Sequence, residues 1–233
     1  MTKLKVLVTG GSGIVGHYVI DELYKQGHTV LNADKVRLTG NLKHSGTTGQ
    51  YASASAAIAL RDNWPRIPEF FEVDVTDYGQ VISAMANCDA VIALASRPSA
   101  SYYVEEDVVR TNTMSMWNVC RAAEQLKINQ LVLGSSYNAI GAMGTAQRWE
   151  ENQVKPPNYF PVDQHSRTRA EDPYSVSKWL GEEIADPRAI GIHSARGDPV
   201  VRPAQEVVLP LQHQRGTGEE GPANLPVRPV LMS

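Results

Sequence analysis

Short apolar runs alternate with amphipathic segments along most of the chain. The runs with strand character are residues 3–9, 29–33, 70–73, 90–94 and 130–133. Between them, and again from Asp172 onward, apolar residues recur at helical spacing. Such β–α repetition predicts an α/β fold, a Rossmann-like doubly wound parallel sheet with right-handed crossovers.

Three helices have a clear apolar stripe. The first, over 14–26, carries Val15, Val19 and Leu23 four residues apart, and Gly27 is a plausible stop. Asp77 or Thr76 is expected to cap the second helix. The third covers about 104–127. The stripes of the last two helices are Val81, Ile82 and Met85, and Met116, Val119, Ala123 and Leu126.

Two segments depart from this pattern. Residues 36–68 separate two strands by far more than the usual short connection, and we expect an irregular insertion, with a short helix possible within 54–60. Residues 187–233 hold half of the prolines and repeat Gly, Arg and Gln, a composition typical of poorly ordered chain. We therefore divide the chain into a nucleotide-binding domain, 1–186, and an atypical tail, 187–233.

Composition narrows the class of protein. The net charge of −3 and 42% hydrophobic content fit a soluble globular protein and give no electrostatic case for binding nucleic acid or an anionic membrane. No apolar run is long enough to span a bilayer, and a strand begins almost at Met1. Cys88 and Cys120 are far apart, and the six histidines lack ligand spacing, so we expect buried thiols, no metal site and a cytoplasmic location.

A glycine-rich turn joins the first strand to the first helix. Gly10, Gly13 and Gly16 have the spacing of a turn that holds the pyrophosphate of a dinucleotide at a helix N-terminus. Asp34 ends the next strand, where a carboxylate accepts hydrogen bonds from the adenosine ribose. A plain tight turn is the simpler alternative. A phosphate-binding P-loop is a near match, but His17 stands in place of its lysine.

A second sequence pattern is typical of acid–base catalysis. Tyr174 and Lys178 lie four residues apart on a helix that Asp172 and Pro173 begin. A nearby ammonium lowers the pKa of a phenol, so this pair can exchange a proton with an alcohol or carbonyl. Ser135 and Ser136 follow the fifth strand, at the edge of the sheet where ligands bind. Alternatively, they cap a turn.

Together, these motifs resemble the extended short-chain dehydrogenase/reductases of the NAD-dependent epimerase/dehydratase family. Among its members, uronate dehydrogenases and sugar-nucleotide epimerases have the most similar segment ahead of the tyrosine. The resemblance extends from residue 3 to about 185. It rests on residues 9–16, Asp34, 74–75, 93–96, Asn112, 133–141 and the segment from Tyr174 to Lys178.

The resemblance implies a cofactor site. Gly10, Gly13 and Gly16, with Ile14 and Val15, would hold the pyrophosphate. Asp34 would bind the adenosine ribose and favour NAD, although Lys35 and Arg37 leave NADP as the less favoured cofactor. The other implied cofactor residues are Asp74, Val75, Ala93, Leu94, Ala95, Asn112, Tyr174 and Lys178.

The family also implies the catalytic set. Ser136 would hydrogen-bond the reacting oxygen, Tyr174 would be the acid/base, and Lys178 would bind the nicotinamide ribose and lower the pKa of the tyrosine. Asn112 is alternatively a solvated helix amide. Arg97, in the loop after the fourth strand with Ser99 and Ser101, either binds a polar substrate or has no role in binding.

The resemblance ends near Ile184, where family members continue into further strands and a small substrate domain. We therefore expect that domain to be incomplete or absent in an apparently truncated or altered chain. The leading hypothesis is an NAD-dependent oxidoreductase or epimerase acting on a sugar, sugar acid or sugar nucleotide, with a homodimer as the expected assembly. The alternative is a non-catalytic dinucleotide-binding protein. A serine hydrolase is not supported, because no G-x-S-x-G surrounds Ser12, Ser135 or Ser136.

Overall fold

The computed structural model describes residues 2–37, 69–98, 103–141, 159 and 170–185. Five strands and their helices alternate along these segments. The strands are β1 (Lys5–Thr9), β2 (Thr29–Asp34), β3 (Glu69–Glu72), β4 (Ala90–Ala93) and β5 (Gln130–Leu133). The helices are α1 (Ile14–Lys25), α3 (Tyr78–Met85), α4 (Glu105–Leu126), the 3₁₀ helix η2 (Tyr137–Ile140) and α6 (Pro173–Ala185). The predicted order of elements is confirmed, while η2 was not anticipated.

The strands form one parallel sheet in the order β3-β2-β1-β4-β5. β1 lies at the centre, with Val6 opposite Val30 of β2 on one side and Ala90 of β4 on the other. The chain therefore winds outward from β1 in two directions, which confirms the doubly wound sheet. In such a sheet the switch point lies beside the carboxyl end of the central strand, where ligands characteristically bind.

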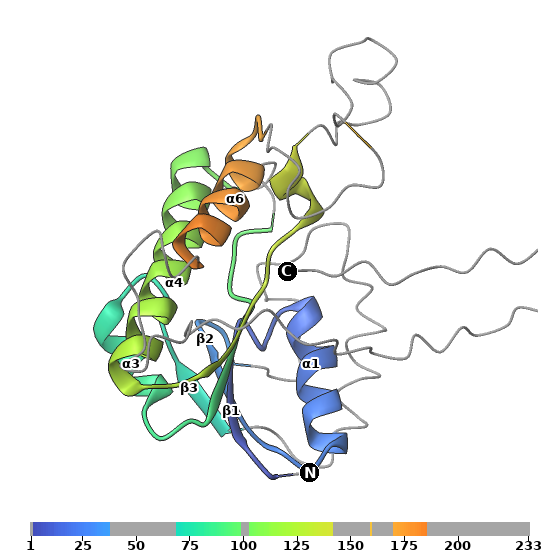
Figure 1. Ribbon diagram of the computed structural model, residues 1–233, viewed down its shortest axis with the longest axis vertical. Helices are drawn as coiled ribbons and strands as arrows, with labels where there is room; N and C mark the ends of the chain where they lie inside the picture. Colours follow the sequence, from blue (N-terminus) through green and yellow to red (C-terminus); the bar gives the residue numbers. More distant parts are fainter. Residues whose placement is uncertain (1, 38–68, 99–102, 142–158, 160–169, 186–233) are drawn as a thin grey trace, which may run out of the picture.

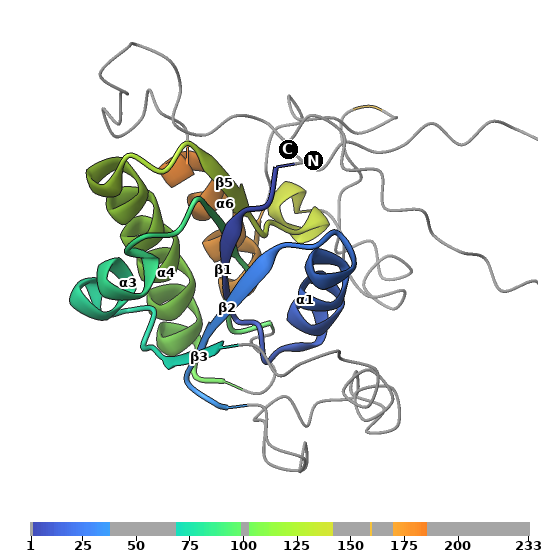
Figure 2. The same cartoon turned by 90° about the horizontal axis from the view of Figure 1, so that it is seen from below.

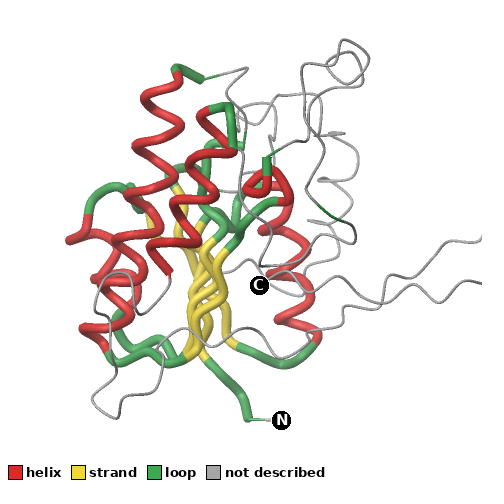
Figure 3. The backbone as a smooth tube through the Cα atoms, turned by 45° about the horizontal axis from the view of Figure 1, so that its top comes forward, coloured by secondary structure: helices red, strands yellow, loops and turns green. Residues whose placement is uncertain are grey.

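Helices cover both faces of the sheet. Figures 1 and 2 show α1 on one side and α3, α4 and α6 on the other, and Figure 3 shows the strands edge-on between these layers. Because successive side chains of a strand point to opposite faces, Leu7 packs in the core beneath α3 and α4, whereas Val6 and Val8 pack with Ile20 of α1. Two apolar cores thus share the central strand.

The stripe predicted for α1 is wrong at its first position. Val19 and Leu23 pack against the core around the fully buried Ile20, but Val15 is 59% exposed. Val15 lies in the first turn of the helix, beyond the end of β1, so the sheet does not cover it. The other expectation for this helix is confirmed, because Gly27 follows its end with φ +82°.

The long helix α4 buries the predicted stripe and supports α6. Met116, Val119 and Ala123 are buried, and Leu126 packs partly buried against the same core. A Cβ on Gly181 of α6 would lie 3.3 Å from Cε of Met116, so the glycine lets the two helices approach closely. This packing fixes α6 against α4.

Some expectations concern residues outside the described part of the chain. These are the irregular insertion at 36–68 with its short helix, apart from its first two residues, and the tail from 187. The division into a domain and a tail stays a prediction. Among the described residues, Cys88 and Cys120 are buried free thiols as predicted, and no helix is long and apolar enough to cross a membrane.

Candidate active site

The glycine turn after β1 packs directly on the chain that leaves β4. Gly10 has φ +70°, and its N–H donates to the carbonyl of Ala33 at 2.9 Å. A Cβ at this position would lie 2.6 Å from the backbone nitrogen of Ala95, which leaves no room for a side chain. Gly10 therefore brings the turn and the segment Ala93–Ala95 together, two parts of the expected cofactor site.

The other two glycines shape the start of α1. Gly13 is the N-cap and makes no side-chain hydrogen bond to the first N–H groups of α1, so the cap residue itself does not compete with an anion there. A Cβ on Gly16 would lie 2.5 Å from Cα of Gly11, so this glycine lets the helix pack against the turn. Ile14 and Val15 form the first turn, as the cofactor prediction requires. The shape suits a pyrophosphate, although binding itself stays a prediction.

His17 does not act in place of a P-loop lysine in this structure. The side chain is buried, and its Nδ1 lies 2.6 Å from the carbonyl oxygen of Gly13. The imidazole thus contacts the backbone of the turn from inside the protein and does not point outward as a phosphate-binding cation would.

Asp34 lies beside the glycine turn, as expected. Its carboxylate accepts hydrogen bonds from the backbone N–H of Ser12 at 3.1 Å and of Val36 at 3.2 Å. Burial raises the pKa of this carboxyl, against the opposing effect of those hydrogen bonds. Asp34 therefore ties the end of β2 to the turn and stands at the position from which a ribose would be bound.

The buried Asn32, which the motif search missed, reinforces the same junction. Its Nδ2 donates to Oγ of Ser12 at 3.1 Å, and that hydroxyl donates to the carbonyl of Val36 at 2.6 Å. A Cβ on Gly11 would collide with the Asn32 side chain. The sequence did contain a signal for this contact, because a polar residue such as Asn32 inside an otherwise apolar strand needs a hydrogen-bond partner.

Asp74 and Val75 follow β3 at the same edge of the sheet. Val75 is buried, and its carbonyl accepts a hydrogen bond from Nδ2 of Asn118 in α4 at 3.0 Å. The Asp74 carboxylate accepts hydrogen bonds from the backbone and hydroxyl of Thr76 and forms an ion pair with Lys35. Asp77 caps α3 by accepting from the N–H of Gln80, which decides between the two expected caps.

The segment after β4 is held by both neighbouring strands. The N–H of Leu94 donates to the carbonyl of Thr9 at 3.0 Å, and that of Ala95 donates to the Thr9 hydroxyl at 3.3 Å. The N–H of Gly134 in turn donates to the carbonyl of Ala93 at 2.9 Å. The predicted cofactor residues 93–95 thus form a bridge between the glycine turn and the end of β5.

The three predicted catalytic residues meet at the end of β5. Asp172 caps α6 by accepting hydrogen bonds from the N–H groups of Tyr174 and Ser175, as the sequence predicts. Lys178 is buried, and its Nζ donates to the carbonyl of Gly134 at 2.7 Å. The Tyr174 side chain lies near enough to that of Ser136 for this serine to lower the pKa of the phenol. The structure therefore brings the hydroxyl, the phenol and the amine together.

Ser136 also fulfils the simpler alternative. Its Oγ accepts a hydrogen bond from the N–H of Asn138 at 3.2 Å and so caps η2. Capping does not exclude the other role, because the same side chain also lies near Tyr174.

The expected lowering of the tyrosine pKa is not found. Burial raises the pKa of Tyr174, although the neighbouring Ser136 acts in the opposite direction. Nζ of Lys178 lies 5.7 Å from the ring centroid, and the amine donates to a backbone carbonyl instead. Burial likewise lowers the pKa of Lys178, to about 8. Desolvation is the largest cause of both shifts and disfavours the charged form of each group.

Asn112 is buried and hydrogen-bonded to two other segments, so the alternative of a solvated helix amide is wrong. Its Oδ1 accepts from the N–H of Arg97 at 2.6 Å, and its Nδ2 donates to the carbonyl of Arg97 at 3.1 Å and to Oγ of Ser177 at 2.8 Å. Asn112 thus joins the loop after β4 to α6. A direct contact with a cofactor stays a prediction.

The Arg97 side chain is engaged within the protein. Its Nε lies 3.0 Å from Oδ2 of Asp107, and its guanidinium lies 4.5 Å from the centre of the Tyr103 ring. This arrangement ties the loop to the start of α4 and gives no support to a free substrate-binding cation. Ser99 and Ser101 lie outside the described residues.

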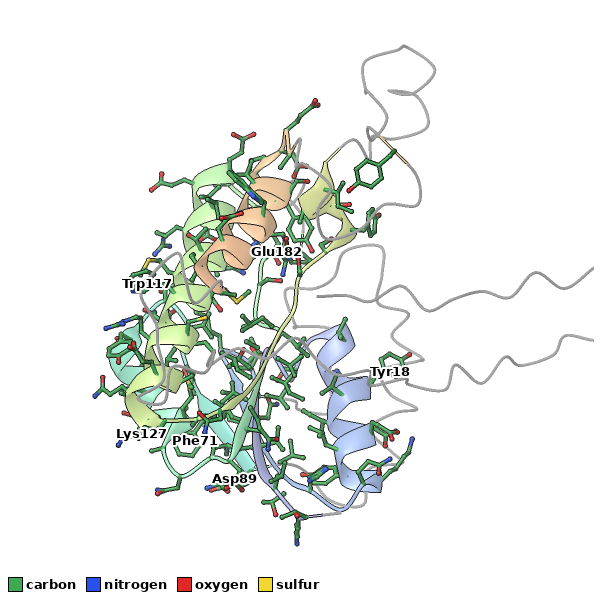
Figure 4. All side chains as sticks on the ribbon, in the orientation of Figure 1. Tyr18, Phe71, Asp89, Trp117, Lys127 and Glu182 are labelled. Carbon is green, nitrogen blue, oxygen red and sulfur yellow. The ribbon has the colours of Figure 1, made fainter. Side chains whose placement is uncertain are left out.

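Glu182 extends the contact between α6 and β5 by one helical turn. It accepts a hydrogen bond from the Ser135 hydroxyl, and Figure 4 shows it near the end of β5. Tyr174, Lys178 and Glu182 lie four residues apart and contact Ser136, Gly134 and Ser135 in turn. Sequence reasoning missed Glu182, although its spacing from Lys178 was the available signal.

Comparison with known proteins agrees with this geometry. Residues 6–189 match the NAD dependent epimerase/dehydratase family. The chain belongs to this family. A putative UDP-glucose 4-epimerase of Methanocaldococcus jannaschii is 25% identical over 180 residues, covering 76% of the chain and 48% of the relative. A dTDP-glucose 4,6-dehydratase of Neisseria meningitidis is 25% identical over 193 residues, covering 76% and 49%.

Solved structures show the same fold. A UDP-glucose 4-epimerase from Stenotrophomonas maltophila with bound NAD has a TM-score of 0.60 at 24% identity, covering 81% of this chain and 49% of that one. A UDP-glucose 4-epimerase from Brucella ovis in complex with NAD has a TM-score of 0.58 at 21% identity, covering 82% and 50%. The chain spans about half the length of the relatives that it matches.

The close packing at Gly16 yields a first prediction. Gly16→Ala should destabilise the fold by about 1–3 kcal/mol, because the added methyl overlaps the backbone of the turn. Gly79→Ala in α3 is the matched control, since its Cβ would meet nothing closer than 3.3 Å. Urea unfolding measures both changes. Equal stabilities of the Gly16 and Gly79 variants would contradict the close packing.

A second prediction concerns Lys178. Its pKa of about 8 in the folded protein lies below the ordinary lysine value of 10.5, so this group makes the stability of the fold rise as the pH increases between those values. NMR with ¹³C-labelled lysine should show one amine, absent in Lys178→Met, that titrates near pH 8. Lys25, which is exposed and paired with Asp21, should titrate above 10.5. Titration of Lys178 alongside Lys25 would refute the effect of burial.

Proposed function

We propose that the protein is an NAD-dependent oxidoreductase or epimerase that acts on a sugar nucleotide. The observation that carries the proposal is a convergence at the carboxyl edge of the sheet. The glycine turn after β1 and the group Ser136, Tyr174 and Lys178 at β5 are joined by the backbone of residues 93–95. A dinucleotide needs such a span, with phosphates at one end and a proton-transfer site at the other.

The residues present fit NAD. Gly10 and Gly16 let the turn pack against Ala95 and against the start of α1, and the N-cap Gly13 makes no side-chain hydrogen bond to the N-terminal N–H groups of α1 that would bind an anion. Asp34 supplies a carboxylate for the adenosine ribose, while Asp74 and Val75 border the adenine. We assign Tyr174 and Lys178 to the nicotinamide ribose end of the site.

The chemistry then follows from the side chains. Bound NAD would supply a hydride acceptor and donor at the nicotinamide. Tyr174 would return a proton to a substrate carbonyl or take one from an alcohol, and Ser136 would hydrogen-bond the same oxygen. Because burial raises the pKa of Tyr174, its neutral form predominates at neutral pH, and that form is suited to donating the proton. Lys178, largely protonated below its pKa of about 8, would favour the phenolate left behind.

Sugar nucleotides are the substrate class that the relatives support. The names of the relatives include a UDP-glucose 4-epimerase of Mus musculus and the dTDP-glucose dehydratase described above. Interconversion of a sugar alcohol and its carbonyl requires the proton transfer assigned to Tyr174, in one direction or the other. Sugar acids remain within the proposal because the oxidation of their hydroxyl groups needs the same transfer of a proton and a hydride.

The direct test combines binding with turnover. Calorimetry should show that the purified chain binds NAD, and incubation with nucleotide sugars and uronic acids should give epimer exchange, dehydration or NADH. Tyr174→Phe should reduce turnover by at least 10²-fold and leave NAD affinity within about twofold, because the phenol acts in proton transfer. Tyr18→Phe is the control, since Tyr18 lies on the outer side of α1 (Figure 4).

Two results would contradict the proposal in different ways. Unchanged turnover in Tyr174→Phe would remove the assigned acid/base. NAD binding without turnover on any member of the panel would support the alternative, a non-catalytic dinucleotide-binding protein.

We also propose a homodimer formed through α4. Met114 and Trp117 are partly exposed at 38% and 39% and lie three residues apart on the helix, and Figure 4 shows Trp117 on its outer side. Two large apolar side chains on one outer face favour burial against another surface. A second copy of the chain, which presents the same face, is our proposed partner.

The dimer makes its own prediction. Wild-type protein should sediment as a dimer, and Trp117→Glu should shift it to the monomer by placing a charge in the contact. Val132→Glu in β5, exposed to a similar extent at 44%, should leave the dimer intact. A monomeric wild type at micromolar concentration would contradict this assignment.

A further inference from the structure

The two cations that follow Asp34 are both engaged within the described part of the protein. Nζ of Lys35 lies 3.1 Å from Oδ2 of Asp74, and the guanidinium of Arg37 lies 5.0 Å from the centre of the Phe70 ring. From the sequence, these cations left NADP as the less favoured cofactor beside NAD. Their partners on β3 and just beyond it change that expectation.

Strand pairing determines where Asp74 lies. β3 runs parallel to β2 with Glu72 opposite Asp34, and the N–H of Val73 donates to the carbonyl of Asp34 at 3.1 Å. Asp74 therefore leaves the sheet beside Lys35. Thr76 holds Oδ1 of Asp74 through its N–H at 2.9 Å and its hydroxyl at 2.7 Å, while Oδ2 pairs with the lysine.

This geometry bears on the difference between two dinucleotides. NADP carries a phosphate dianion on the adenosine ribose where NAD has a hydroxyl, so NADP needs a free cation near Asp34. We propose that Asp74 is a specificity-determining residue that disfavours NADP by keeping Lys35 in an ion pair. This inference rests on the proposed binding of NAD and adds a second determinant to Asp34.

The expected effect is moderate. The side chains of Lys35 and Asp74 are 49% and 36% exposed, so solvent screens their interaction. Asp74→Asn keeps an oxygen for Thr76 but removes the negative charge, which releases Lys35. One additional unpaired charge a few ångströms from a phosphate in a water-exposed site should raise the NADP:NAD affinity ratio by about fivefold.

The test is a double-mutant cycle read by calorimetry at low salt. The affinities of NAD and NADP are measured for wild type, Asp74→Asn, Lys35→Gln and the double variant. The ratio of the two affinities is the readout, because a general loss of adenine binding lowers both together. Asp74→Asn should raise the NADP:NAD ratio, and the rise should be absent in the double variant.

Lys35→Gln alone provides an independent arm should Asp74→Asn fold poorly. A lysine already held by Asp74 contributes little to NADP binding, so this variant should change the ratio by less than about twofold. A large fall in NADP affinity would overturn the inference, because it would mean that Lys35 is already available. An equal rise for Asp74→Asn with and without Lys35 would also overturn it, since Asp74 would then act without the lysine.

The cycle separates this inference from the function beneath it. If wild-type protein binds neither dinucleotide, the proposed function fails and the inference fails with it. If wild type binds NAD and the ratio does not respond to Asp74→Asn, only the inference fails.

Discussion

The candidate site depends on one close approach of two backbones. Gly10 lies so near Ala95 that a single added carbon would overlap it, and this contact places the turn after β1 against the segment after β4. Both segments leave strands that are neighbours in the sheet but far apart in sequence. The winding of the sheet in two directions from β1 creates this meeting point, and the absence of a side chain at Gly10 lets the backbones use it.

A second constraint places the acid–base group relative to that turn. Hydrogen bonds from Gly134 to Ala93 and from Lys178 to Gly134 connect the end of β5 to β4 and to α6. Gly181 lets the same helix pack closely on α4, where Asn112 reaches Ser177. The position of Tyr174 is therefore set by backbone contacts on one side and helix packing on the other, and neither depends on a bound ligand.

Much of the fold could be predicted because its signals are local. The strands, the glycine spacing, the Asp172 cap and the stop at Gly27 depend on a few neighbouring residues each. The exposure of Val15, the burial of Asn112 and the pairing of Lys35 with Asp74 depend on which elements meet in space. The predicted direction of the Tyr174 pKa shift was wrong for the same reason. The four-residue spacing identified Lys178 as a neighbour but gave no information on how deeply the phenol is buried.

The most direct test of the central claim is a crystal structure of the chain with NAD. The account predicts the pyrophosphate at Gly10, Gly13 and Gly16, the adenosine ribose at Asp34, and the nicotinamide beside Tyr174 and Lys178. A dinucleotide bound elsewhere, or one whose nicotinamide points away from the phenol, would contradict it.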